Sequence, residues 1–250
     1  MSKGKKAGII VGCIIAIIII VVIATRPPGL PSLGPLGPTV SIDYEVTTDS
    51  NYPYLTVRVE GLEEEYGVGV LNPEGKPLQI VGIWCDELTS SYVTTVKFYM
   101  HAGVSESGLQ KDPVPGEYHI QVMSYHTDKK FESKPVFEGP DVSITNVQFE
   151  GGNFKYLGGT KVIAQVYNGG DLPVFVGHMR LLVGGLETDH DMRGQECLPP
   201  GATTAIEGRF HLGFLEHGTY PVTVEIYSYR EAAYYSERVR LASYETQVSG

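Results

Sequence analysis

The stretch GTYPVTV at residues 218–224 decides the fold of this chain. From Tyr220 to Ile226, apolar side chains alternate strictly with polar ones or proline. This period of two is typical of a β-strand with one buried face, because successive side chains of a strand point to opposite sides of a sheet. A related stretch, GEYHIQV, occupies residues 116–122, which is 102 positions earlier.

A second pair of stretches recurs at the same offset. GPTVSI at residues 37–42 returns as GPDVSI at residues 139–144. Two separate matches at one spacing indicate an internal repeat of about 100 residues, which is the size of an immunoglobulin-like β-sandwich. We therefore predict an all-β fold with two tandem immunoglobulin-like β-sandwich domains, at residues 40–138 and 139–250.

The remainder of both repeats also carries strand patterns. Runs rich in β-branched and aromatic residues, such as VTTVKFY at 93–99, are separated by turn signals such as NPEG at 72–75. Apart from the N-terminal run, no stretch has helical periodicity. Further strands are expected at residues 40–47, 55–59, 78–84, 117–124, 142–150, 161–167, 173–183, 203–210 and 236–242.

The N-terminus predicts export. Residues 7–25, AGIIVGCIIAIIIIVVIAT, are uncharged and follow three lysines. At about 1.5 Å per residue this run nearly matches a hydrocarbon core of about 30 Å, so residues 1–25 are predicted to form a cytoplasmic tip and a single transmembrane helix in the cell membrane. The lysines keep the N-terminus cytoplasmic and the bulk of the chain extracytoplasmic. Two alternatives stay open, a signal peptide cleaved near Thr25 and a lipoprotein signal ending at Cys13, and both also export the chain.

The segment after the membrane run predicts a spacer. Residues 26–39, RPPGLPSLGPLGPT, contain five prolines and three glycines, which favours an extended, semi-rigid stalk of about 40 Å. The chain beyond it carries 15 basic residues against 29 acidic ones. An acidic surface repels phosphate backbones, so nucleic acid is not an expected partner.

Turn and strand motifs of the second repeat carry a family resemblance. VYNGG at 166–170, LPPG at 198–201 and the strand at 218–224 resemble the CARDB-like (cell-adhesion-related) family of prokaryotic immunoglobulin-fold modules. In that family a strand ends in Asn-x-Gly, a later turn carries Pro-Gly, and a Gly-x-Tyr-x-Val-x-Val strand closes the sheet. The resemblance covers roughly residues 142–242. It implies a surface adhesion or spacer module, with no catalytic residues to carry over.

The reactive residues predict no catalytic centre. Cys85 and Cys197 lie in different repeats and off the common register, which favours two buried or partly buried thiols, although an inter-domain bridge stays open. Motifs of serine hydrolases, zinc proteases and phosphate-binding loops are absent from the sequence. The acidic cluster ETDHD at 187–191, followed by Glu196, could offer oxygen ligands to Ca²⁺ from a loop, but acidic turns are usually only solvated. We expect no catalytic residue, no cofactor and no metal.

Tyrosine is the enriched residue that could contact a partner, with 16 in the chain. Aromatic rings with polar tips suit carbohydrate or protein surfaces, and they also suit half-buried strands. The candidate partner contacts are Tyr229, Tyr234 and Tyr235, which follow the last repeated strand, where the two copies diverge.

The predicted layout of two sandwiches on a stalk favours binding over catalysis. We expect a membrane-anchored extracytoplasmic binding, adhesion or cell-envelope structural protein, whose partner is a protein or glycan at the cell surface. The alternative is an accessory subunit that docks its ectodomain on a membrane complex for transport, secretion or filament assembly. An extracytoplasmic hydrolase is the third and least favoured function.

Overall fold

The computed structural model describes residues 40–49, 52–88, 91–101, 110–150, 159–211, 218–229 and 238–249. In these ranges the chain forms sixteen β-strands joined by turns, and no helix. The prediction of an all-β fold is therefore confirmed. The predicted membrane run at 7–25 and stalk at 26–39 lie outside the described residues, and no helix within the described ones has the length and apolarity to cross a bilayer.

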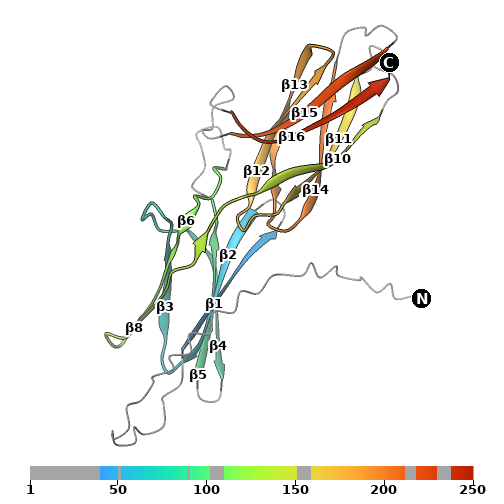
Figure 1. Cartoon of the computed structure of the whole chain (residues 1–250). Helices are drawn as coiled ribbons and strands as arrows, with labels where there is room; N and C mark the ends of the chain where they lie inside the picture. Colours follow the sequence, from blue (N-terminus) through green and yellow to red (C-terminus); the bar gives the residue numbers. More distant parts are fainter. Residues whose placement is uncertain are drawn as a thin grey trace, which may run out of the picture.

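The first half of the described chain, up to Phe137, forms two main antiparallel sheets (Figure 1). The four-stranded sheet has the order β1 (Ser41–Asp49), β2 (Tyr52–Leu62), β5 (Ser91–Tyr99), β4 (Ile80–Leu88). The three-stranded sheet has the order β3 (Tyr66–Leu71), β7 (His119–Ser124), β8 (Lys130–Ser133). A short pair, β6 (Gly116–Glu117) and β9 (Val136–Phe137), completes this half.

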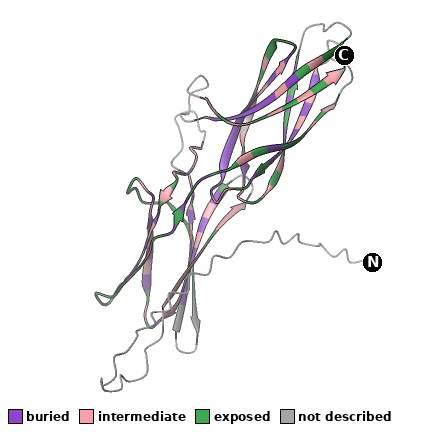
Figure 2. Cartoon of the chain, viewed as in Figure 1, coloured by how far each residue is buried: buried purple, intermediate pink, exposed green. Residues whose placement is uncertain are grey.

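The core of the first half lies between its two sheets. Alternate residues of each strand point inward, so Leu55 and Val57 of β2 and Phe98 of β5 meet Ile120 and Val122 of β7. All five are fully buried, and Figure 2 shows buried segments along the strands of both halves. Burial of each such side chain contributes about 1.5–3 kcal/mol to folding.

The second half, from Val142 onward, has its own pair of antiparallel sheets. The three-stranded sheet has the order β10 (Val142–Glu150), β11 (Thr160–Asn168), β14 (Thr203–Phe210). The four-stranded sheet has the order β13 (Leu186–Leu198), β12 (Val174–Val183), β15 (Thr219–Tyr229), β16 (Arg238–Ser249). Its core is separate from the first and is built from fully buried residues such as Val162, Leu181 and Ile206.

The fourth strand joins a different sheet in each half. In the first half, β4 pairs with β5 and extends the sheet that contains β1 and β2. In the second half, β13 pairs with β12 and extends the opposite sheet. The sequence analysis did not predict β13 and wrongly placed the acidic cluster at 187–191 on a loop; those residues are part of this strand. The strands β3, β8 and β9 were also not predicted.

A tight clasp joins the two halves, formed by residues 138–141 and 168–172. The Asp171 carboxylate accepts hydrogen bonds from the backbone N–H groups of Glu138 and Gly139, at 2.9 and 2.8 Å. A Cβ atom at Gly170 would lie only 2.1 Å from the Gly139 carbonyl oxygen, so only glycine fits this close approach. Leu172, the last residue of the clasp, comes from the second half but is fully buried in the core of the first.

The two described cysteines differ in environment. Cys197 is buried, and Cys85 is exposed on the edge strand β4. The expectation that both thiols would be at least partly buried is therefore wrong for Cys85, because an edge strand of the sheet leaves that side chain uncovered. Both thiols are free, so the inter-domain bridge is not formed.

Candidate functional site

The outer surface of the four-stranded sheet of the first half carries a row of aromatic side chains. Residues of β2 and β5 that alternate with the core residues point away from it. Tyr54 of β2 lies directly opposite Tyr99 of β5, and Trp84 of β4 lies opposite Thr95 of β5. We define the aromatic face as the set Tyr52, Tyr54, Trp84, Lys97, Tyr99 and His101.

The rings of the aromatic face pack against one another. Tyr54 and Tyr99 stack, with ring centroids 5.4 Å apart and planes inclined by 28°. The Tyr99 ring also lies 6.0 Å from Tyr52 and 5.3 Å from His101. These distances are typical of favourable aromatic pairs, which contribute about 0.5–1.5 kcal/mol each. The row is therefore ordered before any ligand arrives.

A lysine links the tyrosines to the tryptophan. The Lys97 ammonium lies 5.3 Å from the centre of the Tyr54 ring and 5.9 Å from that of Trp84, within cation–π range. Burial among these neighbours, followed by the charge of Tyr99, raises the pKa of the Tyr54 hydroxyl. The Tyr54 hydroxyl therefore stays neutral and able to donate a hydrogen bond at physiological pH.

Trp84, the single tryptophan of the chain, rests on the backbone of its own strand. A Cβ atom at Gly82 would lie 2.6 Å from the indole Cη2, so the six-membered ring occupies the space over this glycine. The side chain is nevertheless 51% exposed. An aromatic ring held against a strand with half of its surface open to solvent is available to a ligand.

The chemistry of the aromatic face suits binding. Exposed aromatic rings accept the C–H faces of sugars or the apolar groups of a protein, while their hydroxyl and imidazole tips supply hydrogen bonds at the rim. Because the rings are already ordered by mutual contacts, a ligand loses little affinity to their immobilisation. The six residues contain no nucleophile with an adjacent base.

Strand β4 adds an apolar edge beside the aromatic face. Ile80, Val81 and Ile83 are 45%, 42% and 58% exposed. In the described sheet β4 pairs only with β5, so its other edge presents backbone N–H and C=O groups. An exposed apolar edge of this kind is able to pair with another chain.

The four-stranded sheet of the second half carries charged groups on its outer surface. His178 of β12 is completely buried, with Nδ1 2.7 Å from Asp191 Oδ1 and Nε2 3.0 Å from Asp189 Oδ1. Arg238 of β16 places Nη1 2.9 Å from His178 Nε2 and 3.2 Å from Asp189 Oδ2. We define the charged network as His178, Arg180, Asp189, Asp191, Glu225, Tyr227, Arg238 and Arg240.

The imidazole of His178 has suitable partners in either protonation state. A neutral ring that donates from Nδ1 to Asp191 accepts from Arg238 at Nε2. A protonated ring donates to both Asp191 and Asp189 instead. The buried histidine is thus satisfied structurally, without a substrate.

The arginines of the charged network hold its acids ionised. Arg180 Nε lies 3.1 Å from Asp189 Oδ1. Burial alone would raise the pKa of Asp189, but hydrogen bonds from Arg180 and Arg238 outweigh it and lower that pKa. Burial likewise opposes ionisation of Glu225, whose pKa is lowered by hydrogen bonds from Tyr227 and Arg240.

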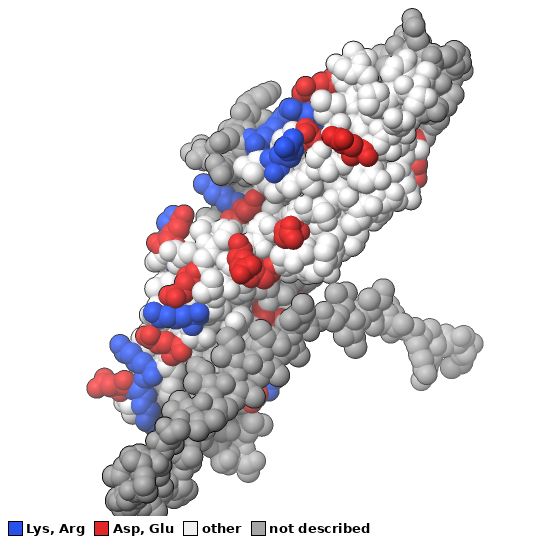
Figure 3. All heavy atoms as spheres, in the orientation of Figure 1, with Lys and Arg blue, Asp and Glu red and all other residues white. Residues whose placement is uncertain are grey.

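Tyr227 lies at the centre of the charged network. Burial, and then its hydrogen bond to Glu225, raise the pKa of Tyr227 to about 12. The Arg180 guanidinium lies 5.3 Å from the Tyr227 ring centroid. The network therefore connects β13, β12, β15 and β16 across the sheet. Figure 3 shows acidic and basic side chains alternating along one side of the visible surface of the molecule.

The acidic cluster considered above as a weak cation site contributes to this network. Asp189 and Asp191 face Arg238, while Glu187 lies 3.2 Å from Arg180. Among the described residues, no group of three or more His, Cys, Asp or Glu side chains is arranged to hold a metal ion. The carboxylates are neutralised by arginines, and this accounts for their concentration in β13.

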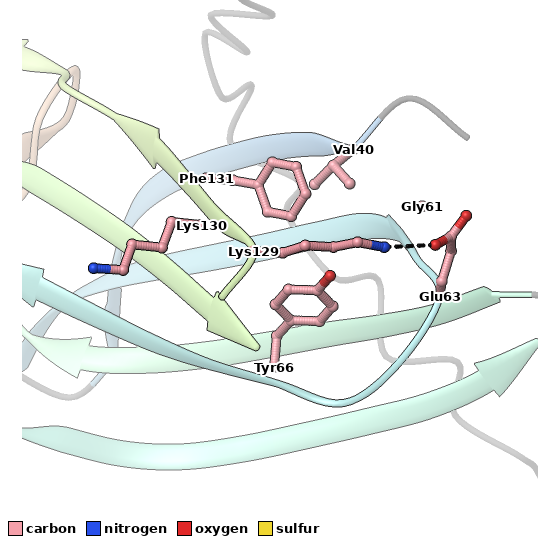
Figure 4. A pocket seen from close by; sticks show the side chains of 7 residues that line it. All are labelled: Val40, Gly61, Glu63, Tyr66, Lys129, Lys130 and Phe131. Atoms are coloured by element: carbon pink, nitrogen blue, oxygen red, sulfur yellow. Dashed lines mark hydrogen bonds and ion pairs between the residues drawn. The ribbon is translucent and has the colours of Figure 1, made fainter. Parts of the chain in front are cut away.

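A shallow pocket of about 340 Å³ lies in the first half (Figure 4). Tyr66 and Phe131 pack there with ring centroids 5.8 Å apart, and Lys129 reaches Glu63 at 2.8 Å. Both charged side chains are half exposed, so the ion pair is weak. The pocket is lined by Val40, Gly61, Glu63, Tyr66, Lys129, Lys130 and Phe131. Its groups form no catalytic constellation, because the pocket offers one ion pair and one phenol.

The predicted partner contacts are only partly described. Tyr234 and Tyr235 lie outside the described residues, and so does the side chain of Tyr229. Tyr229 is the last residue of β15, and its backbone pairs with that of Arg238, next to the charged network. It therefore lies in the second half, whereas the aromatic face lies in the first. Of the other C-terminal tyrosines, Tyr220 and Tyr244 pack against the second core.

The sequence analysis missed the centre of the aromatic face. A usable signal was present, because the alternation in residues 93–99 places Lys97 and Tyr99 on the side opposite Phe98. The glycine two residues before Trp84 was a further indication of a ring lying on the strand. No local signal identifies the charged network, since its members are scattered between residues 178 and 240 and meet only through strand pairing.

Comparisons with known proteins add a distant structural likeness. No protein-family model matches the chain, and no curated protein matches it in sequence. Among solved structures, a DUF4785 family protein from Legionella pneumophila is similar, with a TM-score of 0.28 and 11% identity. The match covers 84% of this chain and 57% of that protein, so the chain spans little more than half the length of this neighbour.

Proposed function

We propose that this chain is a membrane-anchored, extracytoplasmic binding or adhesion protein that presents its aromatic face to a glycan or protein at the cell surface. The membrane run at 7–25 anchors it, and the stalk at 26–39 raises the binding surface above the bilayer. The proposed activity is non-covalent recognition, without catalysis. It requires no cofactor.

The strand order supports two tandem immunoglobulin-like modules, at 40–138 and 139–250. The order β1-β2-β5-β4 opposite β3-β7-β8 corresponds to the four-plus-three arrangement of constant-type immunoglobulin domains. The second half keeps this plan but transfers its fourth strand to the other sheet. The CARDB-like resemblance of the second module is consistent with a surface role, in which such modules position a binding surface.

One observation carries the proposal: Trp84 is half exposed and lies in a preordered row with Tyr54 and Tyr99. Natural surfaces that expose several large aromatic rings together usually contact a partner. In the second half, the four-stranded sheet is the opposite one, and its outer surface carries paired charges, which leaves fewer groups free for a ligand.

Retention on cell-envelope material tests this proposal. The full chain in detergent is incubated with envelope polysaccharide and with membrane proteins immobilised on separate resins. Trp84→Ala and Tyr99→Ala should each weaken retention at least about tenfold, because truncated aromatic anchors at binding surfaces commonly cost 2 kcal/mol or more. Retention on one resin only identifies the partner class.

A matched control separates the aromatic face from general hydrophobicity. Tyr125 is 71% exposed and its ring rests on Gly67 of β3, away from the aromatic face. Tyr125→Ala should retain wild-type binding. Equal loss in Tyr125→Ala and Trp84→Ala would contradict a specific binding face.

The exposed edge of β4 favours a second candidate function, an accessory subunit docked on a membrane complex. Ile80, Val81 and Ile83 would then be covered by a strand of another protein. Crosslinking through the exposed Cys85 in native membranes tests this alternative. A defined adduct with a multi-span protein, lost in Ile83→Lys, would support it, whereas the absence of any adduct would count against it.

A further inference from the structure

Strand β12 is buried on both of its sides at its N-terminal end. Val174 and Val176 point into the second core, yet Phe175 between them is also only 1% exposed and lies outside both core clusters. Cys197, its register partner on β13, is 6% exposed. A strand in a two-layer fold has one side open to solvent, so something else covers Phe175 and Cys197.

The cover is a segment of the first half, residues 110–112, which we name the strap. The backbone N–H of Gln110 donates to Oε1 of Gln195 on β13 at 2.6 Å. The side-chain Nε2 of Gln195 donates back to the backbone carbonyl oxygen of Gln110 at 2.8 Å. Asp112 accepts the backbone N–H of Phe175 at 2.7 Å and the hydroxyl of Ser228 on β15. The strap therefore contacts three strands of the second half.

The Asp112 carboxylate is buried, and none of its hydrogen-bond partners within the described part of the chain is a cation. Burial raises its pKa to about 6, although the hydrogen bonds from Ser228 and Phe175 oppose the rise. Burial, with the charges of Asp112 and Glu196, also raises the pKa of Cys197 to about 12, so the thiol stays neutral. Among the described residues, the groups shown beside the carboxylate are the Phe175 N–H on β12, the Ser228 hydroxyl on β15 and the Cys197 thiol on β13. The charged residues nearest to these in the chain are Lys111, which precedes Asp112, and Glu196, which acts on Cys197.

We propose that the strap is a latch between the two halves, held by Asp112, and that acidification tightens it. A protonated Asp112 keeps both contacts, because its carbonyl oxygen accepts from Phe175 and its hydroxyl group bonds Ser228. An ionised Asp112 also keeps both contacts, but its charge is removed from water, which is unfavourable. The orientation of the aromatic face relative to the second half is thus held more firmly in acid.

The direction follows from proton linkage. When the strap is undocked, Asp112 is hydrated and returns to its ordinary pKa of 3.8, whereas the docked pKa is about 6. The docked state therefore holds the proton more tightly, and the extra stability is fully present below pH 3.8 and lost as the pH rises through 6. Between pH 7.5 and pH 5 the docking equilibrium constant should increase about tenfold.

The buried Cys197 is a native probe of the latch. In the full chain in detergent, Cys13→Ser and Cys85→Ser leave one thiol, and its reaction with 4,4′-dithiodipyridine is followed at pH 5 and pH 7.5. Each rate is divided by that of the same chain unfolded in guanidinium at the same pH, which removes the intrinsic reactivity of the thiol. We expect protection of Cys197 to be about tenfold greater at pH 5 than at pH 7.5.

Three variants make the result specific to Asp112. Asp112→Asn, which can accept from Phe175 and donate to Ser228, should give high protection at both pH values. Asp112→Ala should give low protection at both, and Gln110→Ala should lower protection while keeping the pH ratio. Protection that is independent of pH in the unmodified strap, or that keeps its pH dependence in Asp112→Asn, would overturn the proposal.

Discussion

The two halves of this molecule are built on one repeat, but their outer surfaces differ in kind. The four-stranded sheet of the first half ends in β4 and exposes stacked rings, with Trp84 half open to solvent. The four-stranded sheet of the second half ends in β13 and covers His178 completely with paired charges. The difference teaches that both halves keep the same alternation of core residues, while the fourth strand joins a different sheet in each half and brings different side chains to its outer surface.

A physical reason connects strand position with surface chemistry. In the second half, β13 places Asp189 and Asp191 beside β12, where arginines from β12 and β16 reach them. In the first half, β4 lies beside β5 and supplies Trp84 to a row of tyrosines. A surface whose polar groups satisfy one another gains stability, whereas exposed rings leave contact energy available to a partner.

The largest expected change in stability concerns Leu172, and it tests whether the two cores unfold separately. This residue is the last one of the clasp and comes from the second half, but it is fully buried in the first core. Leu172→Ala should destabilise the first half by about 2–5 kcal/mol through loss of burial and the cavity left behind. Denaturant unfolding followed by the fluorescence of Trp84, which lies in the first half, measures it.

Leu181→Ala is the matched control for this comparison, because Leu181 is fully buried in the second core alone. It should shift the unfolding of the second half and leave the Trp84 transition nearly in place. If Leu172→Ala left the Trp84 unfolding transition unchanged, the result would contradict the claim that the Leu172 side chain belongs to the first core.

The next effect concerns the charged network. His178→Ala should destabilise the second half by about 3 kcal/mol. The substitution leaves a cavity at the buried position of the histidine and removes the hydrogen-bond partner of two acids. Thermal unfolding by circular dichroism gives the change. Arg240→Ala is the control, since its side chain is 61% exposed and its removal should leave the melting temperature nearly unchanged. An equal loss of stability in His178→Ala and Arg240→Ala would contradict the distinction between buried and exposed members of the charged network.

The smallest effect is expected in the first half. Lys129→Ala removes the ion pair with Glu63, whose side chains are 50% and 52% exposed. Water screens such a pair, so the loss of stability should be close to the limit of detection. A double-mutant cycle with Glu63→Ala measures the coupling directly. A coupling as large as that of His178 with Asp191 would contradict the contrast between the two surfaces.

The sequence alone predicted much of the fold. The strands at 142–150 and 203–210 were predicted at their observed bounds, because alternating apolar and polar residues and flanking turns mark them. The strand β3 was missed, since its two glycines weaken the pattern in YGVGVL. The strand β13 was missed because a run of acidic residues is typical of a solvated loop. Only the folded structure shows that Arg180 and Arg238 pair with these acids.

The candidate site was less predictable than the fold. Alternation places Lys97 and Tyr99 outside the core, but it does not reveal that β2, β5 and β4 are neighbours in that order. The buried Asp112 was equally hidden, because its partners Phe175 and Ser228 lie 63 and 116 residues away in the chain. Such contacts depend on tertiary packing, which local patterns do not encode.

A titration of Trp84 fluorescence tests the central claim most directly. Trp84 is the only tryptophan, so its emission reports the aromatic face without a label. Saturable blue-shifted emission is predicted when the full chain in detergent is titrated with the envelope fraction that retains it, because a bound partner removes water from the half-exposed indole. The shift should weaken in Tyr99→Ala and persist in Tyr125→Ala. Demonstrated binding of that fraction with unchanged Trp84 emission would contradict the account, because the partner would then contact another surface.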